Sequence, residues 1–261
     1  MNIKSMHIYP IKGMGGIEIQ EIKFFERGMQ YDRRWMLVNL DGEFITQRSL
    51  AKMTLFHCSI DDKLIVSYEG SSIEIDLDQY SENKILTTVW ENEVNAYEVN
   101  ANISEWFSVQ LDMSCRLVKM VDGFDIYKEL IKGPRETKVS FADGYPYSIV
   151  GTASLDKLSK RLEEPIPANR FRANIVVNTK VAHEEDFWDV ILVGDTKLQV
   201  IKPSARCQVI NIDQKSAEIK KQPLKELAFY RKDGNTVNFG ANTICLVEGV
   251  VSVGDTLHFF D

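Results

Sequence analysis

The chain has 261 residues, of which 44% are hydrophobic and 26% are charged, so it is long enough to bury one large core or two smaller ones. Its 31 Lys and Arg against 38 Asp and Glu give a formal net charge of −7, which disfavours a nucleic-acid partner because a phosphate backbone attracts a basic surface. The N-terminal stretch MNIKSMHIYPIKG lacks the apolar core of a secretion signal, and no stretch reaches the length of a membrane span. We therefore expect a cytoplasmic protein without a membrane partner.

Short strands dominate the first part of the chain. The segment 17–25 (IEIQEIKFF) is apolar or alternating, and 33–47 (RRWMLVNLDGEFITQ) predicts a hairpin around Asp41 and Gly42, a pair suited to the positive φ angles of a tight turn. Further strands are predicted at 63–69, 71–78, 84–90 and 93–99. The segment 100–111 predicts a short helix opened by an Asn or Ser cap. This pattern favours a barrel or sandwich over a doubly wound sheet.

The second part mixes strands with two predicted helices. The segment 151–164 (GTASLDKLSKRLEE) predicts a helix that Thr152 or Ser154 can cap, and 223–230 (PLKELAFY) predicts a helix beginning at Pro223. Strands are predicted at 172–178, 189–194, 197–202 and 207–213. The two VGDT segments, at 193–196 and 253–256, each precede a strand and predict turns.

The segment YPIKGMGG places Lys12 beside Gly13 and two further glycines. Such a loop can hold a phosphate with its amides and an ammonium group, although neither a P-loop nor a dinucleotide-binding order is present. A plain glycine-rich turn between strands is the alternative interpretation.

Two sets of arginines accompany apolar strands. Arg33 and Arg34 precede one strand, and Arg170 and Arg172 are spaced two apart, which would place them on one face of another strand. Converging guanidinium groups bind a multiply charged anion well, whereas surface ion pairs with Glu and Asp would explain each arginine singly.

The four cysteines, Cys58, Cys115, Cys207 and Cys245, lie far apart and show no spacing of a zinc ribbon, a redox dithiol or an iron–sulfur cluster. Each is expected to be a free thiol and, by default, a buried small hydrophobe. Cys207 differs because Arg206 precedes it, and a neighbouring cation lowers the pKa of a thiol toward the reactive thiolate, a soft metal ligand.

Six segments together resemble a known family. They are YPIKG, YDRRWMLVNLDGEFITQR, FADGYPYSIVGTASLDKL, NRFRANIVV, ARCQVINID and FGANTICLVEGVVSVGD. In this order they resemble the MOSC family, the molybdenum-cofactor-sulfurase C-terminal-like proteins that carry an N-terminal MOSC β-barrel domain. Bacterial N-hydroxylated-base reductases and the mitochondrial amidoxime-reducing component belong to this family.

The resemblance implies a mainly β fold with a few helices (α+β), in which an N-terminal MOSC β-barrel domain (1–110) packs on a C-terminal MOSC β-barrel domain (111–261). It implies the molybdenum cofactor, molybdenum held by molybdopterin, with Cys207 as the metal ligand and catalytic residue. It also leaves pyridoxal phosphate open as a second ligand. The implied cofactor-binding residues are Lys12, Gly13, Arg33, Arg170, Arg172, Asn174, Ser204 and Arg206. Relatives commonly have serine where this chain has Gly13, which removes one hydroxyl.

The implied function is the reduction of N-hydroxylated compounds such as hydroxylaminopurines, amidoximes and hydroxylamines. The chain ends at Asp261 without the ferredoxin domain of some bacterial relatives. Electrons are therefore expected from a separate flavin or iron–sulfur protein. The alternative is a non-catalytic cofactor carrier, or a sulfur-transfer protein in which Cys207 carries a persulfide.

Overall fold

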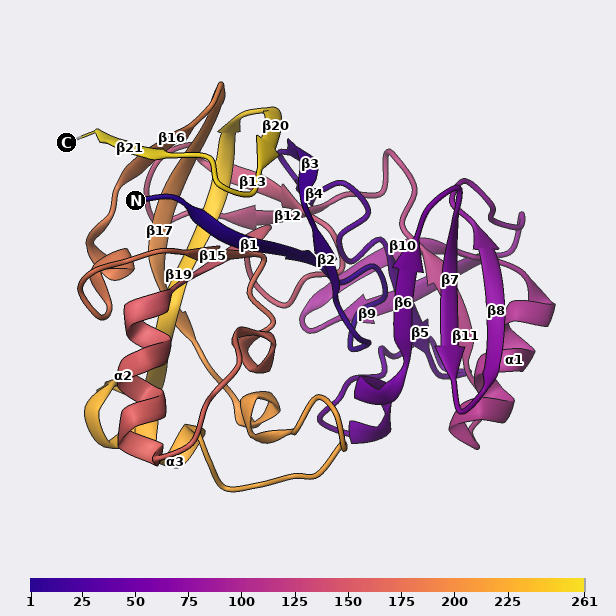
Figure 1. Ribbon diagram of the computed structural model, residues 1–261. Helices are drawn as coiled ribbons and strands as arrows, with labels where there is room; N and C mark the ends of the chain where they lie inside the picture. Colours follow the sequence, from indigo (N-terminus) through magenta and orange to yellow (C-terminus); the bar gives the residue numbers. More distant parts are fainter. Residues whose placement is uncertain (261) are drawn as a thin grey trace.

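The computed structural model describes residues 1–260 and shows two β-rich lobes side by side (Figure 1). The first lobe comprises β5 (Trp35–Val38), β6 (His57–Ile60), β7 (Lys63–Tyr68), β8 (Ser71–Asp76), β9 (Lys84–Val89), β10 (Asn92–Glu98), α1 (Ala101–Leu111) and β11 (Arg116–Lys119). The second lobe comprises β1 (Ile3–Ile8), β2 (Ile17–Ile19), β3 (Glu21–Phe25), β4 (Gly28–Met29), β14 (Tyr147–Gly151), α2 (Thr152–Leu162), β15 (Ile175–Val177), β16 (Val190–Val193), β17 (Thr196–Ala205), α3 (Leu224–Tyr230), β18 (Lys232–Asp233), β19 (Thr236–Val247), β20 (Gly249–Ser252) and β21 (Leu257–Phe260). A hairpin of β12 (Ile126–Glu129) and β13 (Glu136–Val139) follows the first lobe.

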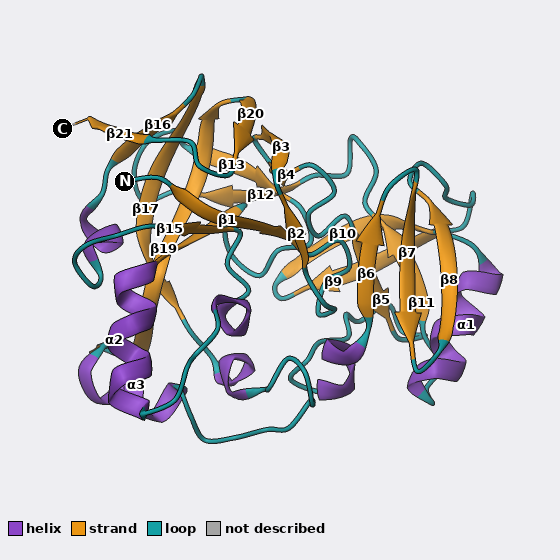
Figure 2. Ribbon diagram, in the orientation of Figure 1, coloured by secondary structure: helices purple, strands orange, loops and turns teal. Residues whose placement is uncertain are grey.

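Strands far outnumber helices throughout the described chain, as Figure 2 shows. The predicted mainly β class with a few helices is therefore confirmed. No helix among residues 1–260 is long and apolar enough to cross a membrane.

The first lobe is built around the sheet β5-β11-β10-β9, which has a hydrophobic cluster on each face. Successive side chains of a strand point to opposite faces, so Trp35 and Leu37 enter the cluster beneath α1 while Met36 and Val38 enter the cluster that β12 and β13 cover. This double burial explains the unbroken apolar run of β5. The predicted cap of α1 is confirmed, because the Asn100 side chain accepts a hydrogen bond from the Ile103 amide.

The second lobe contains a nine-stranded sheet that takes its first strands from the beginning of the chain. Its order is β2-β1-β15-β14-β19-β17-β16-β21, with β18 paired to β19. β1 pairs antiparallel with β15, and β3 pairs antiparallel with β20. In space, therefore, β1 to β4 belong to the second lobe, whereas Ile11 and Met14, between β1 and β2, pack into the hydrophobic cluster of the first lobe. Residues 9–13 and 30–35 thus lie at the junction between the lobes.

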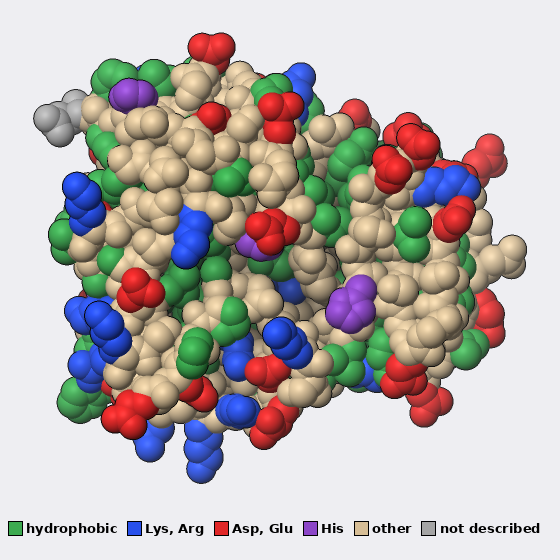
Figure 3. All heavy atoms as spheres, viewed as in Figure 1, with side chains coloured by type: hydrophobic (Ala, Val, Ile, Leu, Met, Phe, Trp, Pro, Cys, Tyr) green, Lys and Arg blue, Asp and Glu red, His purple; other side chains and the backbone are tan. Residues whose placement is uncertain are grey.

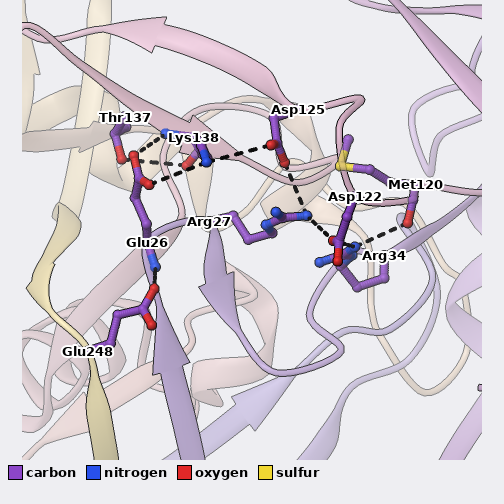
Figure 4. A network of polar contacts seen from close by, with 9 residues as sticks. All are labelled: Glu26, Arg27, Arg34, Met120, Asp122, Asp125, Thr137, Lys138 and Glu248. Atoms are coloured by element: carbon purple, nitrogen blue, oxygen red, sulfur yellow. Dashed lines mark hydrogen bonds and ion pairs between the residues drawn. The ribbon is translucent and has the colours of Figure 1, made fainter.

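Ion pairs reinforce the junction on the side drawn in Figure 4. Arg27, in the turn between β3 and β4, lies 2.9 Å from Asp122 and 3.0 Å from Asp125. Arg34, just before β5, lies 3.6 Å from the same Asp122. The loop that carries both aspartates leaves β11, so the Arg27 pairs join the two lobes, whereas the Arg34 pair lies within the first lobe.

Three local predictions were wrong. Residues 43–47 form only isolated bridges rather than a full return strand, although the turn at Gly42 has the expected positive φ of 84°. Gln208–Asn211 is a 3-10 helix instead of a strand. Gly151 occupies the cap position of α2 without a side-chain cap, because the Thr152 hydroxyl bonds with Thr179 and that of Ser154 bonds with Glu185.

Gly42 generates a stability prediction, because a Cβ there would lie 2.4 Å from the Leu86 carbonyl oxygen. Gly70 is a matched control, since its φ of 80° is similar but no atom lies within 4 Å of its Cβ position. Gly70→Ala should cost roughly 1–2 kcal/mol for the left-handed backbone alone. Gly42→Ala should cost clearly more in urea unfolding, and equal losses would contradict the close approach.

Candidate functional site

A cavity of about 390 Å³ lies where the two lobes meet, a volume suited to a small ligand or cofactor. All nine predicted site residues line it. Among its lining residues the only carboxylate is Asp143, against eight cations: Lys12, Arg33, Arg48, Lys128, Arg170, Arg172, Lys202 and Arg206. On the face drawn in Figure 3, acidic side chains predominate over the first lobe, while several basic ones lie near the lobe boundary. The cavity therefore concentrates positive charge within an acidic protein.

Gly13 lies in a turn that forms part of the cavity wall. Its φ is 85°, and a Cβ there would lie 2.9 Å from the Met53 methyl carbon, so both the backbone and the space favour glycine. Its carbonyl oxygen accepts a hydrogen bond of 2.7 Å from Gln47, a buried residue of the first lobe. The loop is thus held by the opposite lobe.

Arg33 and Arg172 share the ring of Tyr9, a fully buried residue after β1. Their guanidinium carbons lie 4.6 and 4.2 Å from the ring centroid. Arg33 donates to the Arg172 carbonyl oxygen at 3.1 Å, and Arg172 donates to the Met14 carbonyl oxygen at 2.6 Å. Burial lowers the pKa of Arg172 to about 10, which leaves it charged at neutral pH. The two side chains act as one rigid cationic unit.

The prediction that Arg170 and Arg172 lie on one face of a strand was wrong. Arg170 lies in the 3-10 helix Ala168–Phe171, and Arg172 ends it with a left-handed φ of 51°. Arg33 also has a left-handed φ, of 50°, and precedes β5. Non-glycine residues adopt this conformation at a cost, and such strain gathers at functional sites.

Asn174 and Asp32 hold the Arg33 side chain in place. The Asn174 side-chain oxygen accepts from Arg33 at 3.1 Å and from the Ser148 amide at 3.3 Å, while its nitrogen donates to the His7 carbonyl at 3.2 Å. Asp32, only 1% exposed, accepts from the Tyr9 amide at 2.7 Å and from Arg33. Both residues fix the position of Arg33.

Arg170 retains unused donors. It is 6% exposed and its Nη2 donates to Asp213 at 2.9 Å, but its Nε and Nη1 are buried without a partner among the described residues. A buried donor without a partner is costly, and an anion in the cavity would satisfy it.

Each guanidinium nitrogen of Arg206 donates to a group of the protein, and its charge also interacts with the neighbouring Cys207. Its guanidinium donates to the carbonyl oxygens of Phe239 and Phe171 at 2.8 and 2.9 Å and to the Ser148 hydroxyl at 3.1 Å. Burial lowers its pKa to about 10. Ser204, two residues earlier on β17, is 5% exposed and also lines the cavity. Arg206 therefore supports the wall beneath the sulfur.

The guanidinium that contacts Cys207 belongs to Arg48, which the sequence reasoning missed. Its Nη2 donates to the Cys207 sulfur at 3.2 Å, and its guanidinium carbon lies 4.3 Å from the Trp90 ring centroid. Arg48 comes from the first lobe and Cys207 from the second. The only available signal was its position at the end of the quoted segment YDRRWMLVNLDGEFITQR.

Lys12 and Asp143 form an ion pair at the same end of the cavity. Lys12 is 5% exposed and also donates to the Phe141 carbonyl at 2.8 Å. Burial lowers the pKa of Lys12, and Asp143 opposes that shift. Burial alone would raise the pKa of Asp143, but Lys12, Arg48 and the Trp90 indole together lower it to about 2. The site thus combines a thiol, a fixed carboxylate and an excess of cations, a set suited to a soft metal carried by an anionic ligand.

Two family models match successive parts of the chain. The family model for the MOSC domain matches residues 136–258, and that for the MOSC N-terminal beta barrel domain matches residues 1–114. Human "Molybdenum cofactor sulfurase" is 29% identical over 262 residues, covering 91% of this chain, which spans only 29% of that protein's length. Mouse "Mitochondrial amidoxime-reducing component 1" is 28% identical over 241 residues, covering 88% of this chain and 71% of that protein. The YuaD protein from Bacillus subtilis superposes with a TM-score of 0.44 at 10% identity, covering 100% of this chain and 96% of that one.

The Lys12–Asp143 pair generates a pH prediction. A carboxylate with a lowered folded-state pKa stabilises the protein above its unfolded pKa near 4 and loses this effect as pH falls toward 2. Asp143→Asn should therefore melt below the wild type at pH 6, by about 2–4 °C per kcal/mol lost, and the difference should shrink between pH 4 and 2. Asp78→Asn, which removes a fully exposed partner of Lys119, should change little at any pH. A constant difference for Asp143→Asn across this range would contradict the pairing.

Proposed function

The chain belongs to the MOSC family, with a MOSC N-terminal β-barrel domain before its MOSC domain, and on this premise we propose that it is a molybdenum-cofactor-dependent reductase of N-hydroxylated compounds. The observation that carries the proposal is the Cys207 thiol in a cationic cavity shared by both lobes. The relative named for amidoxime reduction supports the substrate class. The reaction would convert R–NH–OH, two electrons and two protons into R–NH₂ and water.

The residues of the cavity fit the cofactor. The Cys207 sulfur is a soft ligand for molybdenum, and the unused Nε and Nη1 of Arg170 are donors for a phosphate, next to Arg33 and Arg172. Gly13, Asn174, Ser204 and Arg206 would shape or support the same wall. When bound, the cofactor would supply the two-electron redox chemistry.

The chain's own groups have separable roles in this proposal. Arg48 orients the Cys207 sulfur with a hydrogen bond and brings one positive charge to it. Asp143, whose pKa is about 2, stays deprotonated at neutral pH and acts as the counter-ion of Lys12 rather than as a proton donor. Asp143 is therefore not the source of the two protons that the reaction consumes. Electrons would come from a separate flavin or iron–sulfur protein, and neither nucleic acid nor membrane is proposed as a partner.

A second candidate function is favoured by the relatives named "Molybdenum cofactor sulfurase". In that function the protein carries the cofactor without catalysis, or Cys207 carries a persulfide to an acceptor. Molybdenum content and turnover together separate these functions, because a reductase holds the metal and turns over, a cofactor carrier holds the metal without turnover, and a persulfide carrier works without the metal.

The Cys207→Ala variant tests the proposal. Protein from a host that makes the pterin cofactor should hold about one molybdenum per chain and reduce a hydroxylamine with a chemical reductant. Cys207→Ala should lower this activity to near background, because no neighbouring side chain replaces a thiolate ligand. Activity, elemental analysis and circular dichroism are measured on the same preparations.

The controls are Cys58→Ala, Cys115→Ala and Cys245→Ala, none of which lines the cavity. Folded forms of all three should stay active. A wild type that holds no molybdenum and does not reduce the hydroxylamine would remove the reductase proposal and leave the sulfur-transfer one.

Arg170→Gln tests the phosphate contact. Loss of charge-assisted hydrogen bonds should weaken cofactor retention by roughly 1.5–3 kcal/mol, or about tenfold to a hundredfold. Pterin and molybdenum content after dialysis provide the measurement. Arg231→Gln, which breaks the pair with Asp186 away from the cavity, is the matched control. Undiminished cofactor in folded Arg170→Gln would show that its free nitrogens serve no ligand.

A further inference from the structure

Two lysines of the cavity wall have no role in the arrangement described above. Lys128, on β12, is half-buried and Lys202, on β17, is exposed, yet both line the cavity. They therefore lie where the cavity meets solvent, and we call them the rim lysines. They come from strands distant in sequence, so tertiary structure alone brings them together.

The rim lysines differ from the other basic residues of the cavity in their lack of acceptors. Lys12 and Arg33 pair with carboxylates, and Arg172 donates to a carbonyl oxygen. Neither rim ammonium group forms an ion pair or a hydrogen bond with any other residue in 1–260. Their charge is uncompensated even though the chain as a whole is acidic.

Both rim lysines lie near one aromatic ring. Their Nζ atoms lie 5.4 and 5.5 Å from the centroid of Tyr145, a buried residue of the same wall. Two like charges near one ring repel each other, and an anion that binds beside them at the rim relieves this repulsion. A carboxylate or a phosphate offers several acceptor oxygens to such ammonium groups.

We propose that the rim lysines form an anion subsite for the substrate, so that the preferred substrates are N-hydroxylated compounds with a carboxylate or phosphate tail. This inference rests on the proposed reductase function. Lys202 precedes Cys207 by five residues, which along a strand corresponds to a separation of at most about 16 Å between Cα atoms. A substrate as long as a nucleotide of a hydroxylaminopurine, whose phosphate stands several bonds from the N–O group, can span this separation. The phosphate of the cofactor has its own donors in Arg33, Arg170 and Arg172.

The test compares two substrates that differ only in the tail: 6-N-hydroxylaminopurine riboside and its 5′-monophosphate. The cofactor-loaded enzyme is driven by a chemical reductant, which removes the donor protein from the assay. In the Lys128→Gln/Lys202→Gln variant, the ratio of kcat/KM for the monophosphate to that for the riboside should fall about tenfold or more, since two charge-assisted contacts are lost. The wild-type preference for the monophosphate should also shrink as salt rises. A parallel pair, 4-carboxybenzamidoxime and benzamidoxime, distinguishes a carboxylate tail from a phosphate tail.

Lys197→Gln is the matched control, because Lys197 is exposed on the same strand but does not line the cavity. It should leave the ratio unchanged. An unchanged ratio in the double variant overturns the proposal. Loss of molybdenum and pterin from the double variant also overturns it, because the rim lysines would then hold the cofactor. An effect seen only with a donor protein overturns it in favour of a docking surface.

A wild type that reduces neither substrate would remove the proposed function and still leave the subsite testable. Titration calorimetry with adenosine 5′-monophosphate and adenosine then measures binding directly. Tighter binding of the monophosphate that the double variant loses would support the anion subsite, and equal binding by both proteins would overturn it.

Discussion

Repulsion between like charges around one cavity is the constraint on which this structure depends. Eight basic side chains line a space that contains one carboxylate, and the fold places acceptors beside six of them, all but the rim lysines. Asp32 supports Arg33, and main-chain carbonyl oxygens support Arg172 and Arg206. Burial lowers the pKa of Arg172 and Arg206 only to about 10, so both stay protonated at neutral pH. The positive charge thus remains available to a ligand.

The path of the chain brings these acceptors to the arginines. β1 and β2 belong to the sheet of the second lobe, and the segment after β1 then passes along the junction before β5 begins the first lobe. This path places the ring of Tyr9 against two guanidinium groups, and the Asn174 side chain donates to the His7 carbonyl oxygen in β1. The left-handed backbone of Arg33 and Arg172 is a local cost that this network stabilises.

The thiol environment also requires both lobes. Cys207 belongs to the second lobe, while Arg48 and the Trp90 ring beneath it belong to the first. The hydrogen bond to the sulfur therefore depends on how the lobes are joined, and the ion pairs of Arg27 with Asp122 and Asp125 join them on another side. A change in lobe packing would reach the sulfur through Arg48.

The sequence by itself determined the strand content, the cap at Asn100 and the turn at Gly42, because strand periodicity and local hydrogen bonding are properties of short segments. The set of residues that share one cavity followed from the family resemblance that its ordered motifs carry. It did not determine the 3-10 helix after Cys207, whose apolar side chains fit either a strand or a helix until packing decides. Nor did it reveal that Arg48 rather than the adjacent Arg206 contacts the sulfur. Adjacency in sequence fixes where a backbone lies but not where a long side chain points. That direction was decided by the nearest unpaired acceptors, and only tertiary structure brings those together.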